Sequence, residues 1–224
     1  MTSAPTPTPV FHITAIENLA SIARAGALLS KTRAGAQGLA PASIAYQHIQ
    51  GRRALRNIPF TPGGILHDYV PFYFAPRSPM LYTINQGNVP NCAYRQDDIA
   101  HLVSSAQQIA GCGRPFVFSD IHAALDYARF FGNLGELNEI EWQIFFEEPR
   151  LDGYCIYWQN RHTPAHHARR LETRQAEFLV YEHVPLSVLR EIGVRTKECE
   201  TRVRAALAAG DWRPIIRVMP GWYY

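Results

Sequence analysis

The chain has 224 residues, enough for one substantial hydrophobic core or at most two small ones. Hydrophobic residues make up 47% and charged residues 18%, a balance that is typical of a folded domain and argues against a disordered chain. The N-terminal residues lack the basic and apolar stretches of a secretory signal, and no apolar run approaches the length of a membrane-spanning helix. We therefore expect one domain over residues 1–224, a cytoplasmic location and no membrane association.

The predicted elements are short strands and short helices. A flexible N-terminal arm at residues 1–9 precedes a strand at Val10–Ile13, and Thr14 and Glu17 then have the spacing of a helix capping box. The other expected elements, in chain order, are a helix ending at Gly26, a loop at 30–43, a helix at Ile44–Arg56, a strand at Tyr69–Phe74, a helix at Ser78–Ile84, strands at Asp98–Ser104 and Pro115–Ser119 with a helix between them, a helix at Ala123–Leu137, an irregular stretch at 145–168, a strand at Arg174–His183, helices at Pro185–Glu191 and Glu198–Ala209, and strands at Ile215–Val218 and Trp222–Tyr224. This order favours an α+β fold with a mainly antiparallel sheet.

The cysteines and lysines are both sparse. The four cysteines are scattered and form no CxxC pair, which argues against a zinc knuckle and for a reducing compartment. The net charge of +3 does not by itself indicate nucleic acid, but Lys31 and Lys197 are the only lysines, so nearly all positive charge is arginine. Arginine fits phosphates and stacks on bases, although the codon usage of a GC-rich genome explains the same bias.

Common cofactor and metal motifs are missing from the sequence. There is no GxGxxG, no GxxxxGK[ST] and no GxSxG, which argues against a Rossmann dehydrogenase, a P-loop ATPase and an α/β-hydrolase. His162 and His166, with His167 beside them, have a spacing that could bind a metal on a helix. Because Pro164 lies between them and no acid or cysteine nearby completes the set, we expect no metal site; the alternative is a metal-dependent nuclease.

Three side chains have types and positions that suit cleavage of a glycosidic bond. Glu177 stands in an otherwise apolar strand, where a charge must be paired, functional or at a solvated edge. Breaking the bond between nicotinamide and ribose in NAD places positive charge on the sugar, which an anion such as Glu177 would stabilise. Arg53 could hold the phosphates and His12 could donate to the sugar or the amide, although a solvated helix face and a structural histidine are the alternatives.

The whole chain resembles the DarT family of bacterial DNA ADP-ribosyltransferase toxins. The segment from Asp68 to Tyr82 is long and highly specific, whereas residues 145–172 match poorly. The matching stretches follow one another along the chain and are Phe11–Thr14, Glu17–Leu19, Ile44–Tyr46, His48–Arg53, Gly63–Gly64, Leu66–Phe74, Pro76–Tyr82, Phe116–Phe118 with Asp120 and His122, Gln175–Val180 and Trp222–Tyr224.

The resemblance implies an ADP-ribosyltransferase fold, with a split antiparallel β-sheet core, short flanking helices and a cleft for NAD. It implies that NAD is a co-substrate and that ADP-ribose passes to a thymine or guanine base of single-stranded DNA, with release of nicotinamide. Arg53 and Glu177 would be the catalytic residues. The residues implied for NAD binding are His12, Thr14, Asn18, Arg53, Tyr73, Met80 and His122, of which the last three are the weaker candidates.

Arginines near the poorly matching segment are the candidates for DNA contact. Arg169, Arg170 and Arg174, with neighbouring aromatic residues, could meet phosphates and stack on bases. The resemblance also implies a DarG-like macrodomain antitoxin as partner, and we expect a monomer. Two other functions are open: an ADP-ribosyltransferase that modifies RNA or protein, and a non-catalytic module that binds single strands.

Overall fold

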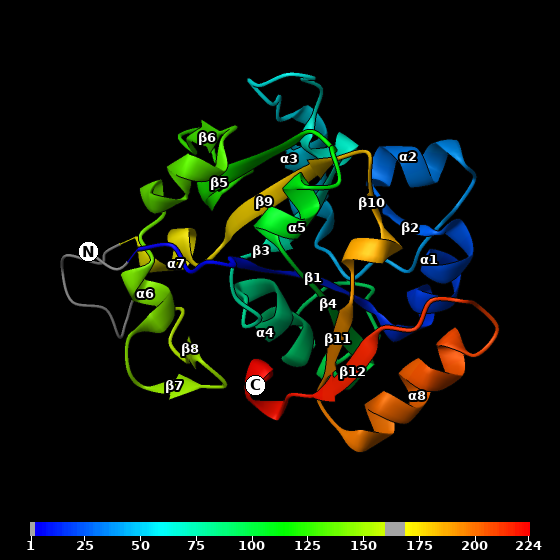
Figure 1. Cartoon of the computed structure of the whole chain (residues 1–224). Coiled ribbons are helices and arrows are strands. Elements are labelled where there is room, and N and C mark those ends of the chain that lie inside the picture. Colours follow the sequence, from blue (N-terminus) through cyan, green and yellow to red (C-terminus); the bar gives the residue numbers. More distant parts are fainter. Residues whose placement is uncertain (1–2, 160–168) are drawn as a thin grey trace.

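The structure is a computed structural model that describes residues 3–159 and 169–224. Its strands are β1 (Pro9–Ala15), β2 (Ala27–Leu29), β3 (Tyr69–Tyr73), β4 (Ile99–Ser105), β5 (Phe116–His122), β6 (Phe130–Phe131), β7 (Arg150–Leu151), β8 (Tyr154–Cys155), β9 (Ala176–Tyr181), β10 (His183–Pro185), β11 (Glu191–Val194) and β12 (Ile215–Val218). Within the described ranges, eight of these strands form one sheet in the order β12-β11-β4-β1-β3-β9-β5-β6 (Figure 1). The neighbours run antiparallel except β11 and β12, which are parallel.

Short helices surround this sheet (Figure 1). The α-helices are α1 (Leu19–Ala25), α2 (Lys31–Ala36), α3 (Gln47–Leu55), α4 (Pro79–Asn85), α5 (Ala106–Ala110), α6 (Gln143–Phe146), α7 (Arg170–Thr173) and α8 (Lys197–Leu207). Single 3-10 turns cover Ile16–Asn18, Leu66–Asp68, Gln96–Asp98, Leu134–Glu139, Leu186–Val188 and Pro220–Trp222. Among the described residues, no helix is long and apolar enough to cross a membrane.

The large sheet is split between β1 and β3. In the described residues, the register of these two strands consists of one pair, Phe11 opposite Tyr73, whereas β1 pairs with β4 along its whole length. The sheet therefore divides into one half with β12, β11, β4 and β1 and another with β3, β9, β5 and β6. This arrangement confirms the predicted α+β fold with a split, mainly antiparallel sheet.

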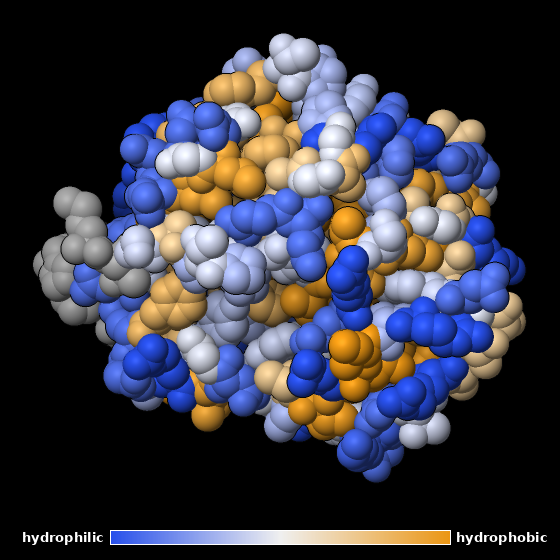
Figure 2. All heavy atoms as spheres, in the orientation of Figure 1, coloured by the Kyte–Doolittle hydropathy of each residue, from blue (hydrophilic) through white to orange (hydrophobic). Residues whose placement is uncertain are grey.

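Aromatic side chains from both halves of the sheet fill the core. Phe11 in β1 and Phe178 in β9 are buried, and the ring of Phe178 stacks on Phe116 of β5 at 5.0 Å. Gly193 in β11 lies against the Trp222 indole so closely that any side chain there would collide with the ring. On the face shown in Figure 2, hydrophobic residues form several patches that are separated by hydrophilic ones.

The predicted capping box at Thr14 is wrong. Thr14 belongs to β1, which stays paired with β4 as far as Ala15, and the 3-10 turn that follows has no side-chain cap. The threonine hydroxyl instead accepts a hydrogen bond from Asn18 Nδ2 at 3.1 Å. The predicted stop at Gly26 is confirmed, because this glycine ends α1 in the left-handed conformation with φ of 67°.

The prediction of a helix at residues 123–137 is also wrong. That stretch contains β6 and a 3-10 turn, and only short turns lie between β5 and β6. A contact distant in sequence explains the difference: Asp120 accepts from the backbone N–H of Arg129 at 3.0 Å and from its Nε at 2.8 Å, which folds the chain back on β5. Helical spacing of apolar residues cannot reveal such a contact.

Three other predictions of secondary structure need correction. The expected loop at residues 30–43 contains α2, whose first turn is capped by Ser30 accepting from the Arg33 N–H. The expected helix at residues 185–191 is a single 3-10 turn followed by β11. The expected strand at 222–224 is absent: Trp222 ends a 3-10 turn that begins at Pro220, and Tyr223 and Tyr224 follow without regular structure. Residues 4–8, placed in a flexible arm, contact the body of the protein: Ala4 N–H donates to Asn138 and Thr8 N–H to Gln107.

Candidate active site

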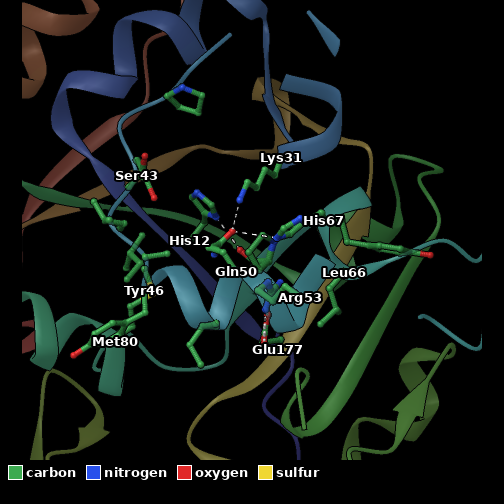
Figure 3. Close-up of a pocket in the computed structure, with 18 of the residues that line it drawn as sticks. His12, Lys31, Ser43, Tyr46, Gln50, Arg53, Leu66, His67, Met80 and Glu177 are labelled. Atoms are coloured by element: carbon green, nitrogen blue, oxygen red, sulfur yellow. Dashed lines mark hydrogen bonds and ion pairs between the residues drawn. The ribbon is translucent and has the colours of Figure 1, made fainter. Parts of the chain in front are cut away.

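A large cavity lies where the sheet is split. Its volume is about 820 Å³, within the range of small-molecule sites, and both strands of the split contribute to its wall. His12 comes from β1, Tyr73 from β3, Arg53 from α3 and Glu177 from β9, so four separate elements meet there. Figure 3 shows His12, Arg53 and Glu177 in this cavity.

Glu177 and Arg53 form a buried ion pair in this cavity. Arg53 Nη1 donates to both carboxylate oxygens of Glu177, at 2.9 and 2.7 Å. Glu177 is 2% exposed and Arg53 is 8% exposed. The backbone N–H of Ala123 also donates to Glu177 Oε1 at 3.3 Å. No described residue accepts a hydrogen bond from Arg53 Nη2, although this atom is buried. The pair is therefore a fixed anion beside a cation that still has donors to offer.

His12 is held as a neutral donor and acceptor. Its Nδ1 lies 2.8 Å from the carbonyl oxygen of Pro71, so Nδ1 carries the proton and Nε2 is an acceptor. Burial lowers the pKa of His12 to about 4, because the hydrogen bond to Pro71, which raises the pKa, offsets only part of the effect of burial. The imidazole is consequently uncharged near neutral pH, which suits hydrogen bonding to a sugar or amide rather than pairing with phosphate.

Comparison with known proteins identifies the family of the chain. The family model described as "ssDNA thymidine ADP-ribosyltransferase, DarT" matches residues 11–224. The chain belongs to the DarT family. A DNA ADP-ribosyl transferase of Thermus sp. (strain 2.9) is 42% identical, with 98% of each chain covered, and one of Escherichia coli O127:H6 is 31% identical, with 81% of this chain and 78% of the relative covered.

Solved structures agree with this family assignment. The structure of Thermus sp. 2.9 DarT in complex with ADP-ribosylated ssDNA has a TM-score of 0.85 and 41% identity, with 100% of this chain and 99% of that chain covered. The structure of the same Thermus protein in complex with NAD+ has a TM-score of 0.80 and 38% identity, with coverage of 99% and 100%. The ADP-ribosyltransferase-like fold implied by the sequence is therefore confirmed.

The other residues predicted to bind NAD also line the cavity, but two of them are occupied in holding a loop. Asn18 Nδ2 donates to Thr14 Oγ1 and, at 3.0 Å, to the carbonyl of Ala42, while its Oδ1 accepts from the Ala42 N–H at 2.9 Å. Asn18 thus clamps the segment of chain between α2 and α3 over the cavity, and Thr14 supports Asn18.

Tyr73, Met80 and His122 lie around the ion pair. Tyr73 stands opposite Glu177 in the register of β3 and β9, and its hydroxyl points at Met80 Sδ, 3.8 Å away. Burial, and then the charge of Glu177, raise the pKa of Tyr73, so it is a neutral phenol. His122 Nδ1 accepts from the Ala124 N–H at 3.0 Å and therefore cannot donate to Glu177 Oε1, 3.9 Å away. Burial lowers the pKa of His122, against the attraction of Glu177.

Only one of the three arginines predicted to bind DNA is exposed. Arg169 lies on the surface, with its guanidinium 5.2 Å from the centre of the Tyr127 ring and 2.9 Å from Glu172. Arg170 and Arg174 are each 1% exposed. Arg170 pairs with Glu147, and Arg174 donates to the carbonyls of Cys155 at 3.0 Å and Arg77 at 3.2 Å. Both guanidinium groups are used to hold the chain together, which leaves Arg169 as the arginine of the three that is placed to contact DNA.

The sequence reasoning also missed residues of the cavity wall. Lys31, Gln50 and His67 line it, and a signal existed in that Lys31 is one of the chain's two lysines. His162, His166 and His167 lie outside the described residues. Elsewhere in the described chain, no group of three or more His, Cys, Asp or Glu side chains is arranged to hold a metal.

Proposed function

We propose that this protein is an NAD-dependent ADP-ribosyltransferase that transfers ADP-ribose to a thymine of single-stranded DNA and releases nicotinamide. The family assignment supports the reaction, and the family model's description supports thymine rather than guanine. The observation that carries the proposal is the buried pair of Arg53 and Glu177 in a cavity of about 820 Å³ at the split of the sheet.

The cavity residues fit NAD. Arg53 Nη2 is a buried donor with no acceptor among the described residues, and leaving such a donor unsatisfied is costly unless a ligand supplies the acceptor. His12, with its Nε2 as acceptor, would hold the ribose or the carboxamide of the nicotinamide riboside. Tyr73 and Met80 add an aromatic ring and a thioether that would pack against the ligand.

Glu177 supplies the charge that the reaction requires. As nicotinamide leaves, positive charge develops on the ribose, and a carboxylate that is already fixed and shielded from water stabilises it without reorganisation. Glu177 meets these conditions, since it is 2% exposed and held by Arg53 and the Ala123 N–H. A thymine that attacks through its ring nitrogen must lose a proton, and Glu177 is the carboxylate placed to accept it.

Single-stranded DNA is the substrate that this chemistry favours. A paired thymine would have to leave the base stack, at a cost of a few kcal/mol, before its ring nitrogen could reach a buried sugar. Tyr127 and Arg169 lie on the surface beside Glu172, a residue of the cavity wall. They offer an exposed ring and an exposed guanidinium, the groups that usually hold a single strand. The toxin role, the DarG-like macrodomain antitoxin and the monomeric state stay predictions.

Incubation of the protein with labelled NAD and separate polymers tests this function. We expect label on single-stranded oligonucleotides that contain thymine, with one nicotinamide released per modification, and little on duplex DNA or on oligonucleotides without thymine. Mass spectrometry of the product identifies the modified base. Label on RNA or protein alone would favour a different transferase, and DNA binding without nicotinamide release would favour a non-catalytic binding module.

A further inference from the structure

Lys31, Gln50 and His67 form a polar cluster on the cavity wall, separate from the Arg53–Glu177 pair (Figure 3). They come from α2, α3 and the 3-10 turn Leu66–Asp68. Lys31 Nζ donates to Gln50 Oε1 at 2.8 Å, and His67 Nε2 donates to the same oxygen at 3.1 Å. One amide oxygen therefore holds an ammonium and an imidazole side by side.

Lys31 has no carboxylate partner in the described part of the chain. The other lysine, Lys197, pairs with Glu200 at 2.8 Å. The two carboxylates that line the cavity are already paired, Glu177 with Arg53 at 2.7 Å and Glu172 with Arg169 at 2.9 Å. Lys31 therefore brings a positive charge to this part of the cavity wall that no carboxylate of the described residues pairs with.

The electrostatics of the cluster point the same way. Partial desolvation of the ammonium, and then the positive charge of Arg53, lower the pKa of Lys31. Burial, and then Lys31 and Arg53, lower the pKa of His67, against the attraction of Asp68. Positive groups are thus close enough to repel one another, and an anion bound between them would relieve that repulsion.

We propose that Lys31, positioned by Gln50 and His67, is a phosphate-binding subsite of the cavity. The inference rests on the proposed function, because both substrates carry phosphate: the pyrophosphate of NAD and the backbone of the DNA strand. A lysine ammonium binds phosphate as a compact charge, and Lys31 has two N–H groups left after its bond to Gln50. Gln50 keeps the ammonium in the cavity without neutralising it.

Four variants separate this subsite from general charge effects. Lys31→Gln removes the charge, Lys31→Arg keeps it, and Gln50→Glu places a carboxylate against the ammonium. Lys197→Gln is the matched control, since it removes the same charge from α8, away from the cavity. Lys31 is exposed, so we expect the thermal midpoints of its variants to match that of the unmodified protein.

The dissociation constants for NAD and for a thymine-containing single strand are measured separately, each without the other substrate. Lys31→Gln and Gln50→Glu should raise one of them about tenfold, the loss expected for one charge-assisted hydrogen bond, while Lys31→Arg and Lys197→Gln stay within about threefold. A rise for NAD assigns the pyrophosphate and a rise for DNA assigns the backbone phosphate.

The proposal is overturned if Lys31→Gln changes both constants by less than twofold, or no more than Lys197→Gln does. This failure is distinct from failure of the proposed function. If the unmodified protein labels DNA and the Lys31→Gln variant binds NAD and DNA normally, only the subsite is refuted. If Lys31→Gln weakens ligand binding but the unmodified protein never labels DNA, only the transferase reaction is refuted.

Discussion

Arg53 and its neighbour Arg52 are adjacent in α3 and have opposite environments. Both line the cavity, but Arg52 is exposed to solvent, whereas Arg53 is buried and pairs with Glu177. Removing one partner of a buried pair is costly because the other charge is left without compensation in a poorly solvated place. The sequence could not tell which of two consecutive arginines is buried. It offered Arg53 as a candidate for the phosphates, and the resemblance implied its catalytic role.

Substitutions of the two arginines should therefore have different effects on the free energy of unfolding. Arg53→Ala should lower the free energy of unfolding by about 3 kcal/mol, because Glu177 stays buried without its counter-ion. Arg52→Ala, the matched control, should change it by less than about 0.5 kcal/mol, as is usual for an exposed site. Denaturant unfolding of both variants measures the difference. Equal stability of the two would show that the ion pair is not buried in solution.

Buried neutral histidines make stability depend on pH. Burial lowers the pKa of His101, and likewise of His12, to about 4 from an ordinary value of 6.5. The unfolded chain therefore binds more protons than the folded one between these values. As pH falls from 6.5 to about 4, each histidine should remove up to about 1.4 kcal/mol of unfolding free energy per pH unit. Urea titrations at pH 4.5, 5.5 and 6.5 measure this slope, and constant stability across that range would contradict the assignment.

At the scale of elements, α7 and the turn beside it combine a surface arginine with two structural ones. Arg170 and Arg174 donate to backbone carbonyls of the segment from Ile144 to Tyr157, so they join that segment to β9. Arg169 alone projects to the surface. A cluster of arginines in a sequence indicates affinity for phosphate only where tertiary contacts leave the guanidinium groups exposed.

Substitutions in this segment should consequently divide into two classes. Arg174→Ala should destabilise the protein by about 3 kcal/mol, since it removes a buried charge that satisfies several carbonyls. Arg169→Ala should leave stability nearly unchanged but weaken single-strand binding and reduce its salt slope by about 0.7. Thermal unfolding and DNA binding over a range of salt concentrations measure the two effects. Loss of DNA affinity without loss of stability in Arg174→Ala would contradict the division.

The segment between α2 and α3 depends on Asn18 for its position. Asn18 makes two hydrogen bonds with the backbone of Ala42, so Asn18→Ala should release this segment from the cavity wall. We expect KM for NAD to rise about tenfold with a smaller change in kcat, because two hydrogen bonds that order the cavity are lost. Steady-state kinetics of nicotinamide release measure both constants. Thr201→Ala is the control, since this exposed hydroxyl donates to the Lys197 carbonyl on α8, away from the cavity. Unchanged KM would show that this segment does not contribute to binding NAD.

Strands with a strong local pattern were predictable, and elements fixed by distant contacts were not. Val10–Ile13 and Tyr69–Phe74 consist mostly of β-branched and aromatic residues, and β1 and β3 cover them apart from Phe74. The stretch at 123–137 has helical spacing, yet the bond of Asp120 to Arg129 folds it otherwise. Trp222–Tyr224 looks like a strand, but Pro220 begins a turn and Trp222 packs on Gly193.

At the scale of the whole molecule, the split in the sheet creates the site. The single residue pair between β1 and β3 lets these strands diverge, and His12 and Tyr73 on either side then line one cavity with Arg53 and Glu177. The sequence suggests His12, Arg53 and Glu177 by the kinds of side chain that the chemistry needs, but only the resemblance implies that they share one site, because they are up to 165 residues apart in the chain (177 − 12). Lys31, Gln50 and His67 could not be grouped without the fold.

The measurement that tests the account most directly is the rate at which Glu177→Gln labels a thymine-containing single strand with ADP-ribose from NAD. The amide keeps the shape of the side chain but loses the negative charge, so the rate should fall at least about 100-fold while the protein stays folded. Glu182→Gln, which removes a carboxylate outside the cavity, should label the strand at the normal rate. Labelling by Glu177→Gln at near the normal rate would contradict the central claim.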